Sequence, residues 1–398
     1  MPQSVLDTLK TYEPELIAIR QDIHRHPETC YEEVRTAALV AGKLREWGIE
    51  VHEGIAKTGV VGVLKGRRPG RRAIGLRADM DALNILEATG APWSSTIPGK
   101  MHGCGHDGHT AMLLGAARYL AENPDFAGTV NFIFQPAEEG GGGGRMMVEE
   151  GLFERFPCDA VYGLHNDPAR PAGVFSGRIG TMTAAAARWQ VTFRGTGGHG
   201  GAAPHLATDC TLPMAAFITN MQSIVSRSMP PFETVVISVG HASTGQKDSP
   251  SVIPAEAVIY GVARTLKDAL HDVIERRMRE LATSLAAAHG CEAELAYRRT
   301  YPPVENAAEP FAVGVAAARA VAGADSFLEM ERATTGAEDF SFLARERPGA
   351  FLRIGNGAPG EKGGHPVHTP LYDFNDKILT VGAAWWVEVV GQELQLGA

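Results

Sequence analysis

Short apolar segments alternate with helical patterns along most of this chain, and this alternation limits the fold more than any other feature. Val60–Leu64, Ala73–Leu76, Thr129–Phe134 and Ala160–Leu164 are four to six residues long and mainly apolar. Segments this short are typical of strands buried on both faces, whereas helices need about 10–12 residues. Thr110–Glu122 is one of the helical patterns between them. We predict an α/β fold whose mixed sheet is covered by helices.

The pattern changes near residue 185. Arg188–Phe193 alternates like a half-buried strand, a glycine-rich loop follows, and the long helical pattern of Asp268–His289 lies between further strand signals. This region predicts a small α+β sandwich, and helix–strand alternation resumes from Pro310. We therefore predict a catalytic domain in two parts, residues 1–185 and 299–398, with a smaller domain of residues 186–298 inserted into it.

Composition narrows the classes of function. Asp and Glu number 46 against 37 Lys and Arg, a net charge of −9, so no overall attraction toward nucleic acid or an anionic membrane is expected. No uninterrupted apolar run reaches the ~18 residues that span a bilayer, and the first residues lack a secretory apolar core. The five cysteines are scattered and odd in number, which fits a reducing compartment. We expect a soluble, cytoplasmic protein.

A glycine-rich loop carries a high density of metal-ligand side chains. His102, Cys104, His106 and His109 place four such groups within eight residues, immediately before the predicted helix Thr110–Glu122. A thiolate and an imidazole two residues apart can converge on one divalent cation, and the glycines between them permit backbone geometries that other residues resist. We interpret the loop as part of a metal site; the alternative is a turn with incidental histidines.

Acidic side chains follow two of the predicted strands. Glu138 and Glu139 come after Thr129–Phe134, and Asp79 and Asp81 come after the second apolar segment. In α/β sheets the ligand crevice lies at the carboxyl ends of the strands. Adjacent carboxylates there can divide the work, one binding metal and the other moving protons. Asp79 and Asp81 lie on one side of an extended chain, and we expect them to orient the metal ligands rather than to ligate.

Two further histidines complete the candidate set. His165 follows the strand Ala160–Leu164, and His368 lies in a loop bounded by Pro366 and Pro370. The five candidates are scattered over 265 residues, yet four of them share a position at a strand end or in the loop that enters a helix. Sites for two cations ~3.5–4 Å apart are assembled in this way at a sheet edge. The candidate ligands are Cys104, His106, Glu139, His165 and His368.

Together these motifs resemble the aminoacylase/carboxypeptidase family of dinuclear metallopeptidases. The similarity runs from Asp22–Glu28 to Pro370, nearly the whole chain. Gly103–His109 and Gln135–Glu139 are specific to the amidohydrolase branch, which includes hippurate hydrolase, auxin-conjugate hydrolases and N-acyl-amino-acid deacylases. The resemblance implies that the five candidate ligands hold two divalent ions per subunit. It also implies that the inserted domain is a lid through which a homodimer or homotetramer forms.

The resemblance also assigns roles outside the ligand set. Glu138 would be the general base that takes a proton from a water bridging the two ions. His199, in a glycine-rich lid motif, would reach across a dimer and stabilise the developing oxyanion. Ser251 and Arg264 would hold the free carboxylate of the substrate, with Ser251 standing where the family usually has asparagine.

The implied function is metal-dependent hydrolysis of the amide bond of N-acyl-amino acids. A dipeptidase or carboxypeptidase using the same site stays open, because one sequence does not identify the residues of the acyl pocket. From a different class, the chain could be a non-catalytic protein that binds metal or an acyl-amino acid, although the retained base Glu138 argues against this. A further alternative makes Cys104 a thiol nucleophile with a histidine base.

Metal identity and partners are also expectations at this stage. A thiolate with imidazoles favours zinc over manganese on softness, with cobalt and nickel as further candidates. The expected partner is a small N-acyl-amino acid, with no nucleic acid and no membrane.

Overall fold

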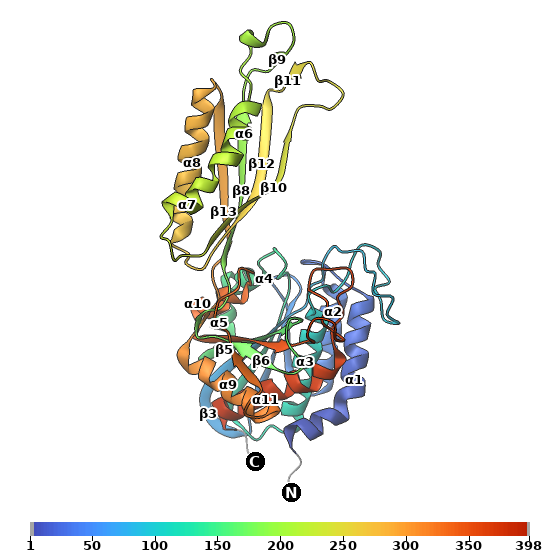
Figure 1. Ribbon diagram of the computed structural model, residues 1–398. Coiled ribbons are helices and arrows are strands. Elements are labelled where there is room, and N and C mark those ends of the chain that lie inside the picture. The colour runs from blue at the N-terminus through green and yellow to red at the C-terminus, as the bar shows by residue number, and fades with distance from the viewer. Residues whose placement is uncertain (1–3, 396–398) are drawn as a thin grey trace. The chain divides into compact units, whose positions relative to one another are not determined.

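The computed structural model describes residues 4–395, which form two compact units (Figure 1). Unit 1 comprises the described residues up to Met182, Val304–Arg332, and those from Glu338 onward. Unit 2 comprises Thr183–Pro303 and Ala333–Ala337. The predicted boundaries differ by a few residues because they fall inside the first and last strands of unit 2.

Unit 1 is built on an eight-stranded mixed sheet with the strand order β1-β2-β4-β3-β5-β16-β6-β15. The central strands β4, β3, β5 and β16 are parallel, so their carboxyl ends meet at one edge of the sheet. The strands are β1 Glu50–Ile55, β2 Gly59–Lys65, β3 Arg68–Asp79, β4 Ala127–Gln135, β5 Ala160–Asp167, β6 Phe175–Gly177, β15 Phe327–Glu329 and β16 Gly349–Gly355. A separate short pair is β7 Gly180–Thr181 with β14 Glu305–Asn306.

Helices cover both faces of this sheet, as predicted. Neighbouring residues of β4, β5 and β16 belong to different apolar clusters; in β4, Phe132 and Phe134 belong to one and Ile133 to the other. The first cluster is closed by α1 Val5–Arg25, α2 Val34–Glu46, α3 His106–Glu122, α9 Ala308–Ala322 and α11 Leu379–Leu394. The second is closed by α4 Gly143–Glu149, α5 Leu152–Arg155 and α10 Phe340–Glu346. The 3-10 turn η2 Asp376–Ile378 precedes α11.

Unit 2 is a four-stranded antiparallel sheet, in the order β10-β12-β8-β13, with helices packed on one face. Its strands are β8 Ala185–Arg194, β10 Val235–Thr244, β12 Glu256–Thr265 and β13 Glu292–Tyr301, and its helices are α6 Thr211–Asn220, α7 Gln222–Ser228 and α8 Leu270–Ala288. The short strands β9 Gly198–His199 and β11 Val252–Ile253 pair with each other, and η1 Pro204–Leu206 follows β9. Figure 1 shows β9 and β11 beyond one end of the four-stranded sheet.

The core of unit 2 follows from strict alternation along β8. Trp189, Val191 and Phe193 point inward and are almost fully buried, and the ring of Phe217 on α6 lies 6.2 Å from that of Trp189. Helices α6 and α7 are separated at Met221, where the chain makes a tighter i→i+3 hydrogen bond from Ile224 N. Across residues 4–395, none of the helices combines the length and apolar character needed to traverse a bilayer.

Candidate metal centre

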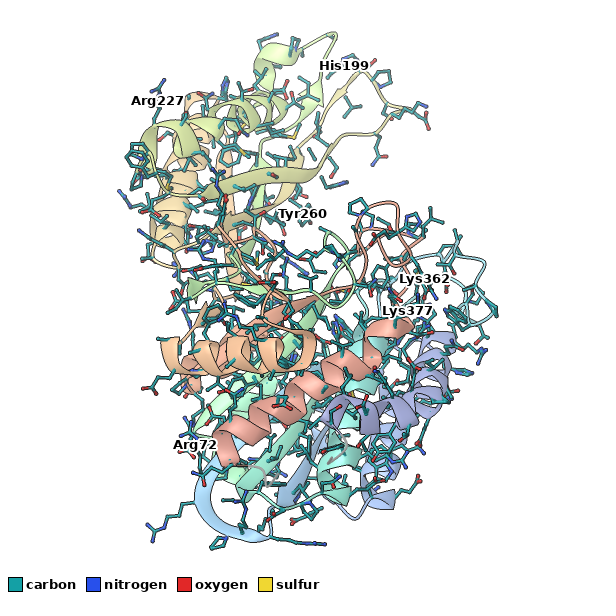
Figure 2. The ribbon with its side chains drawn as sticks, turned by 60° about the horizontal axis from the view of Figure 1, so that its bottom comes forward. Arg72, His199, Arg227, Tyr260, Lys362 and Lys377 are labelled. Carbon is teal, nitrogen blue, oxygen red and sulfur yellow. The ribbon has the colours of Figure 1, made fainter. Side chains whose placement is uncertain are left out.

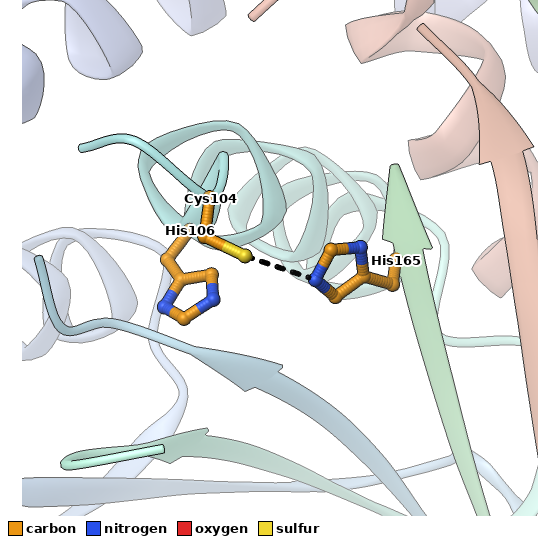
Figure 3. Close-up of side chains that lie close together, drawn as sticks. All are labelled: Cys104, His106 and His165. Carbon is orange, nitrogen blue, oxygen red and sulfur yellow. Dashed lines mark hydrogen bonds between the residues drawn. The ribbon is translucent and has the colours of Figure 1, made fainter. Parts of the chain in front are cut away.

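The five predicted ligands belong to segments that unit 1 brings together at the carboxyl ends of its parallel strands. Cys104 and His106 come from the loop and first turn of α3, Glu139 follows β4, His165 lies on β5, and His368 follows β16. Their donor atoms form two groups, each within 4.8 Å: Cys104 with His106 and His165, and Cys104 with Glu139 and His368. Cys104 belongs to both groups, and together the two groups would hold two divalent ions. Figure 3 shows the first group.

The donor atoms of the candidate ligands face one another, and one buried polar atom among them lacks a hydrogen-bond partner in the described part of the chain. Cys104 Sγ lies 3.4 Å from His165 Nε2, and His368 Nε2 lies 3.0 Å from Glu139 Oε1. Nε2 of His106 is buried and makes no hydrogen bond within residues 4–395. Such atoms are costly unless a cation satisfies them. A thiolate, three imidazoles and a carboxylate therefore fit a pair of divalent ions.

Hydrogen bonds at Nδ1 of His165 and His106 leave Nε2 of each ring available to a metal. His165 Nδ1 lies 2.7 Å from the backbone oxygen of Asn166, and His106 Nδ1 lies 3.2 Å from a carboxylate oxygen of Asp81. Since each acceptor requires a proton on Nδ1, the Nε2 lone pair of each ring is free to ligate. Burial and the neighbouring His109 hold the pKa of His165 well below its ordinary value, which favours the neutral ligand form.

Asp81 connects the α3 loop to the acidic turn after β4. Besides His106, its carboxylate accepts hydrogen bonds from the backbone N–H groups of Glu138 and Glu139, each at 3.0 Å. Asp81 is 1% exposed, so these bonds are shielded from water. The Asp81 carboxylate thus orients the candidate ligand His106 and fixes the turn that carries Glu138 and Glu139.

Asp79 is also buried and contacts His109, a histidine to which the sequence analysis gave no separate role. Its carboxylate lies 2.6 Å from His109 Nδ1 and accepts a hydrogen bond from Arg77 at 2.8 Å. Although burial opposes the charge, His106, His109 and Arg77 hold the pKa of Asp79 well below its ordinary value. His109 Nε2 accepts the backbone N–H of Asn166 at 3.0 Å, so both ring nitrogens are used. The loop density of ligand types was the only sequence signal for His109.

Glu138 stands beside the ligands among other carboxylates. Its carboxylate, with those of Glu338 and Asp339, forms a group whose oxygens lie within 4.8 Å, and its Oε1 accepts the Asp339 N–H at 3.3 Å. Burial, followed by Glu338, Glu139 and Asp339, raises the pKa of Glu138 well above its ordinary value. A carboxylate with a raised pKa accepts a proton more readily than an exposed one.

Arg77 supplies the positive charge that makes this acidic cluster tolerable. Its guanidinium is fully buried and lies 2.9 Å from both Glu338 and Asp339, in addition to Asp79. Burial lowers the pKa of Arg77, but these carboxylates raise it by more. The Arg77 side chain therefore stays protonated. The sequence reasoning missed Arg77, Glu338 and Asp339; the adjacent acids before Phe340 were the available signal.

Two features of the histidine loops remain. His368 has φ +62°, a left-handed conformation that is uncommon for a residue with a side chain, and its N–H donates to Gly103 O at 2.7 Å. This bond ties the two ligand loops together. His102 is also buried, and burial lowers its pKa to about 3, but it belongs to neither donor group.

The other predicted site residues belong to unit 2. His199 is exposed on β9, and its Nδ1 accepts the N–H groups of Gly201 and Ala202 at 3.2 and 3.1 Å (Figure 2). The ring proton is therefore on Nε2, which is available as a donor. Ser251 precedes Val252, which pairs with His199.

Arg264 lies far from that pair within the same unit. It is the ninth residue of β12, eight positions from Glu256, or about 26 Å along the strand. A single unit 2 therefore cannot bring Ser251 and Arg264 to one carboxylate. Burial, and then Arg188, lower the pKa of Arg264, as expected for a cation without an opposing charge beside it.

Known proteins share this architecture over nearly its whole length. The model of the peptidase family M20/M25/M40 matches residues 75–392. The hippurate hydrolase of Campylobacter jejuni is 38% identical over 371 residues, 93% of this chain and 94% of that protein. The thermostable carboxypeptidase 2 of Saccharolobus solfataricus is 35% identical over 388 residues, 96% of each. The solved structure of the Bacillus subtilis YXEP protein, a dinuclear metal-binding peptidase, has a TM-score of 0.82 at 30% identity, covering 98% of this chain and 100% of that one.

An α/β sheet with two ligand groups at its edge and an inserted α+β unit defines a metal-dependent hydrolase. The chain belongs to the peptidase family M20/M25/M40, and its relatives fit the amidohydrolase branch, which confirms the resemblance seen in the sequence. It is an enzyme of the metal-dependent amidohydrolase type.

Proposed function

We propose that the protein hydrolyses the amide bond of N-acyl-amino acids, with two divalent ions held by Cys104, His106, Glu139, His165 and His368. The observation that carries the proposal is the pair of donor groups that share Cys104 and lie beside Glu138. A binding protein would gain nothing from a buried carboxylate with a raised pKa at this position, whereas a hydrolase needs one.

Each residue has a defined part in the proposed reaction. When bound, the two ions supply Lewis acidity to the amide carbonyl and to a water molecule. Glu138 removes the proton of the attacking water and later delivers it to the leaving amine. Asp81 keeps Glu138 in place by accepting the backbone N–H of Glu138. Asp79 holds His109 through a hydrogen bond to its ring. His199 donates from Nε2 to the developing oxyanion.

We further propose that two copies of the chain share unit 2 residues between their sites. Ser251 and His199 lie at one end of unit 2 and Arg264 at the other, so complete recognition of a carboxylate and an oxyanion needs both ends. Strand β10 is an edge strand, a feature that favours pairing with another copy. Light scattering of the purified protein should give a dimer or tetramer; a monomer with full activity would contradict this arrangement.

Zinc is the proposed metal, because one thiolate and three imidazoles form a soft donor set. All five cysteines are free thiols, which supports a reducing, cytoplasmic location. Manganese, cobalt and nickel remain to be compared by adding each back to the stripped protein.

The decisive experiment assays stripped protein against N-acetyl-, N-benzoyl- and indole-acetyl-amino acids after zinc, manganese or cobalt is restored. We expect hydrolysis only with metal, and only when the amino-acid half keeps a free carboxylate, because the proposal gives Arg264 the role of recognising it. Equal turnover of the matching amino-acid amides would remove that role from Arg264. No turnover of any N-acyl-amino acid by the metal-loaded protein would refute the proposed substrate class.

A second candidate, carboxypeptidase activity at the same site, is favoured by the 35% identical thermostable carboxypeptidase. N-blocked dipeptides in the same assay separate the two, since a peptidase would prefer them to simple acyl groups. A thiol mechanism is less well supported, because burial and then Glu139 raise the pKa of Cys104, the opposite of what activates a thiol nucleophile. EDTA should abolish a metal-dependent activity and spare a thiol-dependent one.

A further inference from the structure

A strongly basic segment in unit 1 has no part in the proposed reaction. Residues 65–72 read Lys-Gly-Arg-Arg-Pro-Gly-Arg-Arg, five cations in eight residues of a chain whose net charge is −9. The segment joins β2 to β3 at the ends opposite the metal centre. Asp79 lies six positions beyond Ala73 in β3, about 20 Å along the strand. The metal ligands therefore do not explain these charges.

Only some of these cations are neutralised by partners. Arg68 pairs with Asp125 at 3.1 Å, and Arg72, labelled in Figure 2, pairs with Glu393. No ion pair of Lys65 or Arg71 is found among residues 4–395. These two side chains are exposed and are available to a ligand.

A cavity of about 570 Å³ lies beside Lys65 and Arg71, within the range of about 300–1,000 Å³ typical of small-molecule sites. Its floor is one face of four neighbouring strands. Lys65, Thr129 and Ala73 stand in register on β2, β4 and β3, and Glu50 lines the cavity from β1. Asn131, two positions along β4, is 2% exposed and also lines it. The cavity is thus a formed hollow on a rigid sheet.

The lining of this cavity is strongly cationic. Lys65, Arg71 and Arg155 contribute three positive charges, and Glu50 contributes one negative charge. Glu50 is already engaged by His52 at 2.9 Å. Arg155 lies with its guanidinium carbon 5.1 Å from the ring centroid of Phe156, a contact that places the cation without consuming its charge.

We propose that this cavity is a binding site for a small anion with two or more negative charges. Three cations around one hollow favour a phosphate or a polycarboxylate over a monovalent ion, since each charge can meet its own partner. Phosphates and polycarboxylates share this chemistry, and the two probes in the test below distinguish them. The site is distinct from the metal centre, and the proposal does not depend on the substrate proposed for that centre.

The test measures the binding of inorganic phosphate and of propane-1,2,3-tricarboxylate to the metal-loaded protein by calorimetry at low ionic strength. We expect one saturable site for at least one anion, weakened by added salt. Arg71→Gln should weaken it about tenfold, the effect of losing one charge-assisted hydrogen bond. Arg67→Gln removes an equal charge from the same segment but outside the lining, and should change affinity less than about twofold.

Three outcomes would overturn the proposal. The first is no saturable binding of either anion tighter than about 10 mM. The second is equal weakening by Arg67→Gln and Arg71→Gln, which would mean a diffuse charge effect. The third is binding that persists in the Lys65→Gln, Arg71→Gln double variant, which would place the anion elsewhere. Hydrolase activity of every variant should equal that of the wild type, so a failure of the proposed reaction would not be confused with a failure here.

Discussion

The two units of this protein differ in what they bury. Unit 1 encloses ionisable side chains, including Arg20, Arg77, Asp79, Asp107 and Asp339. Among its described residues, unit 2 buries no Asp, Glu, Lys or Arg side chain. Its buried polar residues are Thr183, Thr192, Thr265 and His271. Buried charge costs stability unless it is paired, so its concentration in unit 1 marks where the protein maintains an oriented polar site.

Pairing in unit 1 is organised around two arginines. Arg77 meets Asp79, Glu338 and Asp339 behind the metal ligands. Arg20 meets Asp376 and lies 3.7 Å from Asp107, which also contacts His24 at 2.8 Å. Unit 2 carries one of its candidate functional side chains, His199, exposed on β9, and its core is apolar. Unit 1 thus contains polar side chains oriented by buried ion pairs, and unit 2 carries exposed candidate side chains on an apolar core.

The comparison is tested most strongly by Glu138→Gln in unit 1. An amide cannot take the proton of the attacking water, so we expect kcat to fall by about 10²–10⁴. Metal content should be unchanged, because Asp81 still accepts the backbone N–H of residue 138. Steady-state kinetics with elemental analysis of the same sample measures both.

Glu149→Gln is the matched control, since Glu149 is an exposed acid on α4. It should leave kcat unchanged. Near-native turnover by Glu138→Gln would show that the buried carboxylate is not the base, and the ionised interior of unit 1 would lose its catalytic explanation.

The sequence sufficed for the features that depend on local pattern. Apolar segments of four to six residues identified the strands of a sheet covered on both faces, and their ends held the residues that lie together at the candidate site. Helix α1 begins at Val5, where the side chain of Ser4 caps it by accepting the Asp7 N–H at 3.1 Å. The apolar pattern alone does not register such a cap.

The contacts behind the ligands escaped prediction because their partners are remote in sequence. Arg77 and Asp339 are 262 residues apart, and Asp81 reaches Glu139 across 58. No periodicity connects such positions, since only the packed sheet brings them together. Ser251 and Arg264 show the reverse case: 13 residues apart in sequence, they lie at opposite ends of unit 2.

His199→Ala tests the exposed candidate side chain of unit 2. If His199 donates to the oxyanion, kcat should fall by about 10²–10³, the usual cost of one such donor. Because the side chain is exposed and lies outside the unit 2 core, the melting temperature should stay within about 1–2 °C of the wild type. His205→Ala, in the same loop region, is the control and should keep full activity. A large drop in melting temperature for His199→Ala would mean that unit 2 also hides structural polar contacts.

Asp81→Asn asks whether buried charge in unit 1 serves the metal. Asparagine keeps the size of the side chain but carries one oxygen acceptor in place of two, so it cannot satisfy His106 and both backbone N–H groups. We expect metal affinity to fall about 10–100-fold, measured by competition with a chelating dye. Asp22→Asn, at an exposed ion pair with Arg35, should leave affinity unchanged. Unaltered affinity in Asp81→Asn would assign Asp81 to folding alone.

The smallest effect contrasts one buried histidine from each unit. In unit 1, burial opposes protonation of His24, but Asp107 and Glu87 prevail and raise its pKa to about 9. In unit 2, burial lowers the pKa of His271, whose Nδ1 lies 2.5 Å from the hydroxyl of Tyr297. His24 therefore binds its proton more tightly in the folded state, and His271 binds it less tightly.

The two histidines should accordingly shift stability in opposite directions with pH. The contribution of His24 is complete below its unfolded pKa of ~6.5 and is lost as pH rises through about 9. That of His271 is present above ~6.5 and is lost as pH falls below that value. In urea unfolding, the deficit of His24→Gln should shrink by about 3 kcal/mol between about pH 6 and pH 9.5, whereas that of His271→Gln should not shrink over that interval. A His24→Gln deficit that is independent of pH would mean that the ring is neutral at all these values, and the Arg20 cluster would then carry one less charge than its contacts imply.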